Sequence, residues 1–280
     1  MAYQDLLVHL DHPKWCARRV AAAVRLAARH GAYLTGVYPL VEIPLLNYIR
    51  EQIPKDTLAR MEAEAQQQAD TAVKSFRQAA ERGGVSFGTR TDRALDTTLA
   101  NVLSMHARYA DLVVLGQVDP EEPPYVGGDL PEQVVLASGR PVLVVPHDWA
   151  PRSLGERVLI AWDASREATR AVSDALPLLQ RAEAVLVVSV NPKSTPLGHG
   201  ELPGADIALH LARHKVEVEV QSVETDRMDI ADALLSFAAD RGCDLLVMGA
   251  YAHSRVRELV LGGATRTILK SMTLPVLMAH

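Results

Sequence analysis

The residues best suited to binding chemistry lie in one glycine-rich segment, which runs from Gly249 to Arg266. Two adjacent glycines, Gly262 and Gly263, directly precede a stretch of helical character, and Thr265 adds a hydroxyl group. Glycine lets a backbone approach a ligand closely, and the N–H groups at a helix start attract anions. The spacing is compatible with phosphate binding, but an ordinary loop with a Gly-Gly turn before a helix has the same pattern.

A carboxylate follows a β-rich run earlier in the same half of the chain. Asp163 ends the run 157–163, and Ser165 can cap a helix over about 166–181. In a doubly wound parallel sheet, ligands bind beyond the carboxyl ends of the strands, at the point where the strand order reverses. We therefore expect the loops that begin at Asp163 and Gly249 to meet if their strands are neighbours.

Strand-like and helix-like runs alternate through both halves, which predicts an α/β fold. Continuous apolar strands separated by helices form parallel sheets that helices cover on both faces. Each half is expected to form a doubly wound, five-stranded, flavodoxin- or Rossmann-like parallel sheet with strand order 3-2-1-4-5. The expected strands lie near 5–11, 33–39, 85–91, 111–116 and 141–145, and near 157–163, 184–190, 216–223, 244–248 and 275–279.

An internal repeat supports this division. Asp111–Gly116 reappears as Asp244–Gly249, and Arg140–Val145 reappears as Leu274–Ala279, at offsets of 133 and 134 residues. Chance similarity between apolar strands does not explain matches in the same order. The sequence therefore predicts two tandem domains, over residues 1–150 and 151–280, with the boundary in the turn-rich stretch around 147–155.

The composition limits the classes of function. The chain has 280 residues, of which 48% are hydrophobic, and 29 basic residues stand against 34 acidic ones for a net charge of −5. This balance disfavours nucleic acid as a partner, because phosphate neutralisation needs a basic surface. No apolar run is long enough for a membrane span, and no signal peptide is visible, so a cytoplasmic protein is expected. Two cysteines are too few for a disulfide framework.

Other catalytic and metal-binding patterns are weak. No GxxxxGK[ST] run is present, and the glycine-rich segment lacks a lysine, so a dedicated kinase or ATPase is not predicted. His9, Asp11 and His12 would be compatible with a metal site, but ordinary polar residues at a strand end are favoured. His210 and His214 share a helix face, with His199 upstream, and a surface pair is favoured there. No catalytic residue and no metal ligand is assigned.

The run from Met248 to Leu269, followed by Pro275-Val-Leu-Met, closely resembles the C-terminal part of the universal stress protein family. The segment Trp162-Asp-Ala-Ser165 looks like that family's Asp-x-Ser segment. The resemblance covers both halves, so the chain is similar to a tandem, two-domain universal stress protein. It implies a stress-response protein that binds or senses ATP or another adenine nucleotide, with or without Mg²⁺, and that hydrolyses it slowly at most.

In nucleotide-binding members of that family, the phosphate loop reads Gly, two residues, Gly, nine residues, Gly, then Ser or Thr. The matching positions here are Gly249, Ala252, Gly262 and Gly263, so the second and the fourth depart from the pattern. The implied site also includes the family's adenosine contacts and the residues beside the loop. The complete set is Ala161, Asp163, Val190, Met248, Gly249, Ala252, Gly262, Gly263, Ala264 and Thr265.

The matching loop of the first half departs further. Asp119 takes the second glycine position, and Glu121 and Glu122 add negative charge, although Gly127 and Gly128 still precede a helix. Carboxylates repel a polyphosphate. We therefore expect the first half to bind no ATP and to serve as a scaffold or to hold another ligand.

Two alternatives remain open at this point. Electron-transfer flavoproteins and adenine-nucleotide hydrolases share a related sheet, and a stress protein without a ligand could act through protein partners. In the universal stress protein family, the terminal edge strands meet across a two-fold axis. The resemblance thus implies an intramolecular pseudo-dimer through 141–145 and 275–279, and two chains could associate further as a homodimer.

Overall fold

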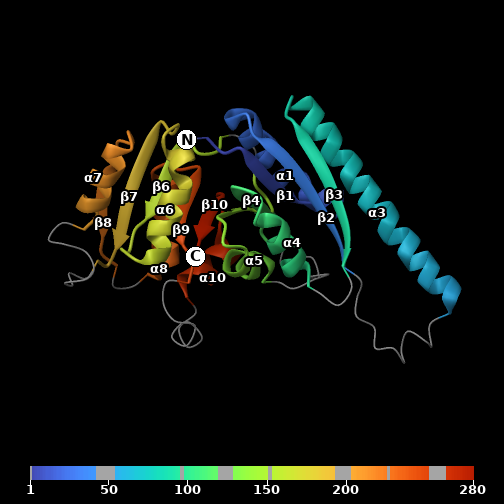
Figure 1. The fold of residues 1–280 in the computed structure, drawn as a ribbon. Coiled ribbons are helices and arrows are strands. Elements are labelled where there is room, and N and C mark those ends of the chain that lie inside the picture. Colours follow the sequence, from blue (N-terminus) through green and yellow to red (C-terminus); the bar gives the residue numbers. More distant parts are fainter. Residues whose placement is uncertain are drawn as a thin grey trace. The chain divides into compact units, whose positions relative to one another are not determined.

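A computed structural model describes residues 2–41, 54–94, 98–118, 129–150, 153–192, 203–225, 228–251 and 263–280. The chain packs into two compact units (Figure 1). The unit that we call N-terminal comprises Ala2–Gly116 and Glu122–Ser138. The unit that we call C-terminal comprises Gly139–His280 and a short segment that begins at Gln117.

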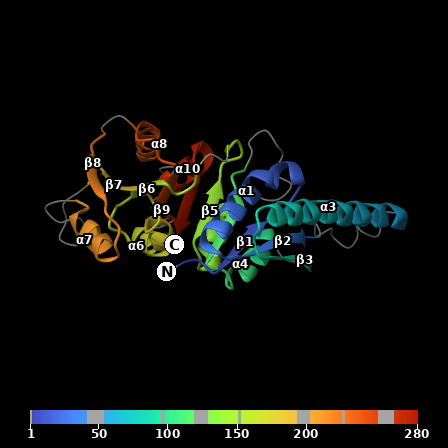
Figure 2. The ribbon, with the colours of Figure 1, turned by 90° about the horizontal axis from the view of Figure 1, so that it is seen from above.

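The C-terminal unit is a doubly wound sheet whose parallel strands follow the order β8-β7-β6-β9-β10. This is the expected order 3-2-1-4-5. Figure 2 shows α6 and α7 on one side of the sheet and α8 and α10 on the other. The elements are β6 (Arg157–Ala161), α6 (Arg166–Leu179), β7 (Ala184–Val190), α7 (Ala205–Arg213), β8 (Glu219–Val223), α8 (Ile230–Asp240), β9 (Leu245–Gly249), α10 (Ala264–Ser271) and β10 (Val276–Ala279).

One further strand, β5 (Val142–Val145), belongs to this unit although it comes from the first sequence repeat. It runs antiparallel to β10, with Val144 opposite Val276 and Val142 opposite Met278. The pairing between 141–145 and 275–279 that the resemblance implied is therefore present. Both strands are fully buried, so this pairing removes an exposed sheet edge.

The N-terminal unit repeats the topology, with parallel strands in the order β3-β2-β1-β4. Its helices α1 and α3 pack against each other, as do α4 and α5. The elements are β1 (Asp5–His9), α1 (Pro13–His30), β2 (Tyr33–Val41), α3 (Lys55–Arg82), β3 (Phe87–Ala94), α4 (Leu99–Ala107), β4 (Leu112–Gly116) and α5 (Leu130–Ser138).

The repeated Asp-Leu motif has a structural reason. The Asp244 carboxylate accepts hydrogen bonds from the backbone N–H of Glu156 at 3.0 and 3.1 Å and of Arg157 at 3.0 Å. Asp111 does the same for Gln4 at 2.7 Å and Asp5 at 3.1 Å. Each aspartate thus fixes the beginning of the central strand of its own unit against the neighbouring strand.

Short polar side chains begin several helices, as the sequence predicts for Ser165. The Ser165 hydroxyl accepts a hydrogen bond from the Ala168 N–H at the start of α6, and the Asp229 carboxylate accepts one from Ala231 at the start of α8. Thr98 caps α4 in the same way. These caps satisfy donors that have no partner inside the helix. None of the helices in the described part of the chain is both long and apolar enough to cross a membrane.

Candidate functional site

The strands β6 and β9 lie side by side in the C-terminal unit, and the next described helices after them, α6 and α10, lie on opposite sides of the sheet (Figure 2). Ala161 at the end of β6 pairs in register with Met248 of β9, and Gly249 follows directly. Val190 ends the neighbouring strand β7. Four of the residues predicted for the site therefore gather at the carboxyl ends of three adjacent strands, where a doubly wound sheet binds its ligands.

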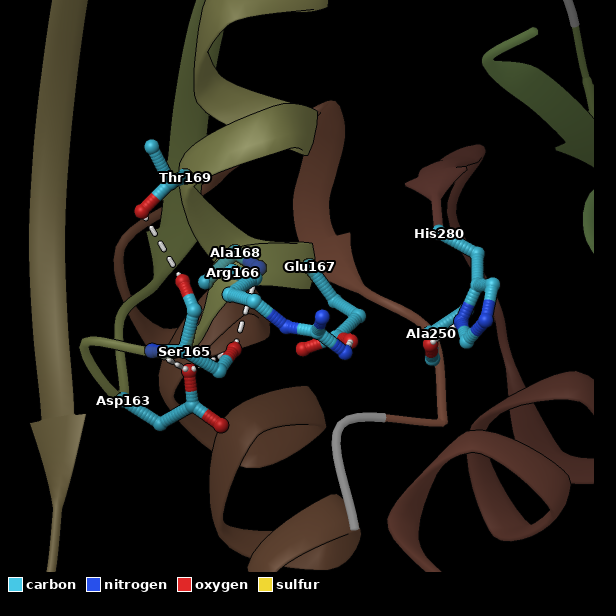
Figure 3. A network of polar contacts seen from close by, with 8 residues as sticks. All are labelled: Asp163, Ser165, Arg166, Glu167, Ala168, Thr169, Ala250 and His280. Carbon is cyan, nitrogen blue, oxygen red and sulfur yellow. Dashed lines mark hydrogen bonds and ion pairs between the residues drawn. The ribbon is translucent and has the colours of Figure 1, made fainter. Parts of the chain in front are cut away.

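Asp163 lies in a short turn between β6 and α6 (Figure 3). Its Oδ1 accepts hydrogen bonds from the Ser165 N–H at 3.0 Å and from the Ser165 hydroxyl at 2.6 Å. Ala164 between them has a left-handed backbone, with φ of 60°. The Ser165 Oγ in turn accepts from the Ala168 N–H at 3.1 Å. This turn holds the exposed Asp163 carboxylate in a defined place at the start of α6.

Gly249 lies directly against the first turn of α6. A Cβ atom built on Gly249 would be 2.6 Å from the Glu167 carbonyl carbon and 2.9 Å from its Cβ. Glu167 itself is only 5% exposed. Glycine is thus required at this position by the close approach of the helix, whether or not a ligand is present.

The chain that leaves β9 is fixed at its first two residues. The Ala250 N–H donates to the Ala279 carbonyl at 2.9 Å, and the Ala250 carbonyl lies 2.9 Å from Nδ1 of His280 (Figure 3). Tyr251 has a left-handed backbone with φ of 60°, and its N–H donates to the Thr265 Oγ1 at 3.3 Å. The start of the loop is therefore tied to the first turn of α10.

The helix α10 begins at the second glycine of the Gly-Gly pair. Gly263 is its N-cap, without a capping side chain, and its carbonyl accepts from the Arg266 N–H at 2.9 Å and the Thr267 N–H at 3.3 Å. No acidic residue lies in the first turn. The N–H groups of Ala264 and Thr265 precede the first intrahelical bonds, so this end of the helix favours a negative charge.

Eight of the ten predicted site residues are described, and they come from the ends of β6, β7 and β9 and the start of α10. Ala252 and Gly262 lie outside the described residues, as do Arg255 and Arg257. Thr265 is 4% exposed, and its hydroxyl oxygen accepts the Tyr251 N–H. The structure thus gives Thr265 a role within the protein that the sequence did not indicate.

Sequence reasoning also missed three side chains around this edge. Ser189 donates its hydroxyl to the Trp162 carbonyl at 2.9 Å, which ties β7 to the turn that carries Asp163. Asn191 has φ of 48°, and its side chain bonds both the N–H and the carbonyl of Thr225. The asparagine directly after a strand was a usable signal, because asparagine adopts left-handed backbones more readily than most residues. His280 carried no comparable signal.

The corresponding edge of the N-terminal unit holds an ion pair between the buried Arg19 and the half-buried Asp11 rather than an exposed carboxylate. His9 is 5% exposed, and burial, with a smaller effect of Arg19, lowers its pKa to about 3. Burial alone would raise the pKa of Asp11, but the guanidinium of Arg19 and the His9 ring hold it below its ordinary value. The acidic loop residues Asp119, Glu121 and Glu122 lie outside the described residues.

The described members of the two histidine groups considered in the sequence form no cluster of metal ligands. The rings of His210 on α7 and His214, its C-cap, are 4.7 Å apart, and His199 lies outside the described residues. Asp11 forms an ion pair with Arg19. Within the residues that the structure describes, no three His, Cys, Asp or Glu side chains are placed to hold a metal ion.

Comparison with known proteins gives consistent matches. Residues 155–280 match the model of the universal stress protein family. A universal stress protein of Synechocystis sp. is 28% identical over 172 residues, which cover 60% of this chain and 57% of the relative. The matched region thus spans little more than half of that relative.

Two solved structures share the fold. A universal stress protein from Archaeoglobus fulgidus DSM 4304 has a TM-score of 0.77 at 16% identity and covers 98% of this chain and 95% of its own. A protein of unknown function from Pseudomonas aeruginosa PAO1 has a TM-score of 0.61 at 13% identity, covering 99% and 92%.

Proposed function

We propose that the chain is a tandem universal stress protein, since residues 155–280 match the model of that family. It binds an adenine nucleotide, ATP first of all, in its C-terminal unit. The two repeats are then residues 1–150 and 151–280, with β5 of the first repeat packed on β10 of the second. The cytoplasmic location of the protein and the association of two chains into a homodimer stay predictions.

One observation carries this proposal: the turn of Asp163 and the start of α10 stand at the same edge of the C-terminal sheet, on either side of Gly249. A carboxylate is an acceptor for ribose hydroxyl or adenine amino groups. The N-terminus of α10 offers backbone donors and a favourable dipole to phosphates. The bond between Tyr251 and Thr265 fixes the near end of the loop relative to that helix.

We propose binding rather than rapid turnover. Phosphoryl transfer depends on an accurately positioned cation and metal ion. The segment from Gly249 to Arg266 holds no lysine, and two of its three arginines, Arg255 and Arg257, lie outside the described residues. Asp163 is a single carboxylate whose Oδ1 already accepts two hydrogen bonds. A Mg²⁺ ion would therefore be held mainly by the phosphates of the nucleotide, as is common for this ion.

Substitution of Gly263 tests the proposal with a matched pair. Aspartate and serine are both good N-caps, so Gly263→Asp and Gly263→Ser should each preserve α10. The aspartate places a negative charge where the phosphates would lie, whereas the serine restores the hydroxyl found in nucleotide-binding relatives. In a thermal-shift titration with ATP, we expect stabilisation of the wild type and of Gly263→Ser, and none of Gly263→Asp.

The alternatives give different results in the same preparation. No shift of either the wild type or Gly263→Ser at millimolar ATP would refute nucleotide binding and favour a protein that acts through partners. A yellow protein with bound flavin would favour the electron-transfer flavoprotein alternative. Fast phosphate release would favour a nucleotide hydrolase.

A further inference from the structure

Arg19 lies inside the N-terminal unit, at the point where the strand order of its sheet reverses. β1 and β4 are neighbours there, and α1 follows β1. Arg19 belongs to α1 and is only 6% exposed. A buried arginine is costly unless its donors and its charge are matched by the protein.

The guanidinium group of Arg19 contacts both strands at this point. Its Nε donates to the carbonyl of His9, the last residue of β1, at 2.7 Å. Its Nη2 forms an ion pair with the carboxylate of Asp11, two residues further on. Its Nη1 lies 2.6 Å from the position that a Cβ atom of Gly116, the last residue of β4, would take.

Among the residues that the structure describes, the C-terminal unit has no cation at the equivalent position of its first helix, α6. The offset of 133 residues matches Gly116 with Gly249. The central strands β1 and β6 begin at Asp5 and Arg157, an offset of 157 − 5 = 152 residues, which matches Asp11 with Asp163 and Arg19 with Ala171. Asp163 is exposed, and its Oδ1 accepts from Ser165, whereas Ala171 is buried in α6. In place of a side chain, the backbone of the first turn of α6 lies against Gly249.

We infer that the N-terminal unit carries a guanidinium-binding site which the chain's own Arg19 occupies permanently. Asp11, the His9 carbonyl and the end of β4 form this site, at the edge of the N-terminal sheet that corresponds to the proposed nucleotide-binding edge of the C-terminal sheet. This inference deepens the proposed function, because Arg19 is a second feature, beside the acidic loop residues, that distinguishes the N-terminal edge from the C-terminal one. The binding of Arg19 itself does not depend on ATP.

Chemical rescue tests the inference. Arg19→Ala, which copies Ala171, leaves Asp11 without its cation, and its melting temperature should fall by roughly 5–15 °C if breaking a buried pair has its usual effect. Millimolar methylguanidinium should then raise the melting temperature of Arg19→Ala but not of the wild type. Methylammonium, which has the same charge without the planar set of donors, should have no such effect.

A second variant keeps the test decisive if Arg19→Ala does not fold. Arg19→Lys retains the charge but lacks the planar guanidinium, so it should fold with lower stability and respond to methylguanidinium less than Arg19→Ala. Equal responses of the variants and the wild type to both cations would overturn the inference, as would an Arg19→Ala protein as stable as the wild type. ATP binding measured on the same samples tests the C-terminal site separately, and we expect it to be unchanged.

Discussion

Gly249 lies so close to α6 that a Cβ atom on it would be 2.5 Å from the backbone nitrogen of Ala168. The first glycine of the nucleotide-loop pattern therefore has a packing role of its own. At Gly116, its counterpart in the N-terminal unit, a Cβ atom would be 2.6 Å from Nη1 at the end of the Arg19 side chain. The same residue type thus accommodates a backbone in one unit and a flexible side chain in the other.

This difference predicts unequal effects of one substitution. Gly249→Ala should lower the free energy of unfolding by about 1–3 kcal/mol or more, because a helix backbone must move. Gly116→Ala should cost less, because the tip of Arg19 can shift. Urea unfolding of the two variants measures both values. If both variants lost the same free energy of unfolding, or if Gly116→Ala lost more, the close contact between Gly249 and α6 would not be the reason that glycine is needed there.

The repeated aspartates should be equivalent. Removing the Asp244 carboxylate in Asp244→Ala leaves the N–H groups of Glu156 and Arg157 without their acceptor, and Asp111→Ala does the same for Gln4 and Asp5. We expect a loss of about 1 kcal/mol for each variant. Hydrogen exchange should quicken at Arg157 in the first variant and at Asp5 in the second. Asp240→Ala, at an exposed position on α8, is the control and should change neither rate.

The buried His9 predicts a pH dependence of stability. Its pKa is about 3 in the folded chain, against an ordinary value of 6.5 that applies when the chain is unfolded. The unfolded chain therefore binds one more proton between these values, so stability is greatest above pH 6.5 and falls as the pH drops toward 3. The contribution of His9 to this slope is about 1.4 kcal/mol per pH unit once the pH is well below 6.5.

The variant His9→Asn isolates this effect. Between pH 6 and about 4, its unfolding free energy should fall less steeply than that of the wild type, since the pKa of Asp11 is lowered and that residue contributes only below its ordinary pKa. His210→Asn, which alters an exposed ring, is the control and should keep the wild-type slope. Identical slopes for the wild type and His9→Asn would contradict the burial of a neutral His9.

Gln117 should stabilise the helix that begins at Gly263. Its Nε2 donates to the carbonyls of Leu269 and Lys270 at 3.0 Å each, and its Oε1 accepts from the His147 N–H at 3.2 Å. Gln117→Glu keeps the acceptor but sets a negative charge against the C-terminus of α10, so it should cost more than Gln117→Ala. Urea unfolding compares the two, and a Gln117→Glu variant as stable as the wild type would rule out this role.

The fold was predictable because its signals are local or repeated. Apolar strand runs and the offset of the Asp-Leu motif indicated two halves of alternating strands and helices, the doubly wound class of fold supplied the strand order, and Ser165 marked the start of α6. The third strand of the second half was expected over 216–223, but β8 begins only at Glu219. Val216 instead bonds back to Leu211 at the end of α7, and it is buried there.

The contacts that shape the two edges were less predictable, because they join residues far apart in the chain. Asp163 and Gly249 could be placed together from topology, but the bond from Tyr251 to Thr265 depends on how the loop packs. Arg19 stands in an ordinary amphipathic helix pattern, and only the folded structure shows that it points inward. A sequence pattern can place Arg19 on one face of its helix, but it does not show which buried groups the guanidinium contacts.

The most direct test of the account is the number of nucleotides that one chain binds. Equilibrium dialysis of the wild-type chain against labelled ATP should give one site per chain. That site should be lost in Gly263→Asp and retained in both Gly263→Ser and Arg19→Ala. A stoichiometry of two, or no binding at millimolar ATP, would contradict the claim that the C-terminal unit holds the ligand while Arg19 fills the N-terminal one.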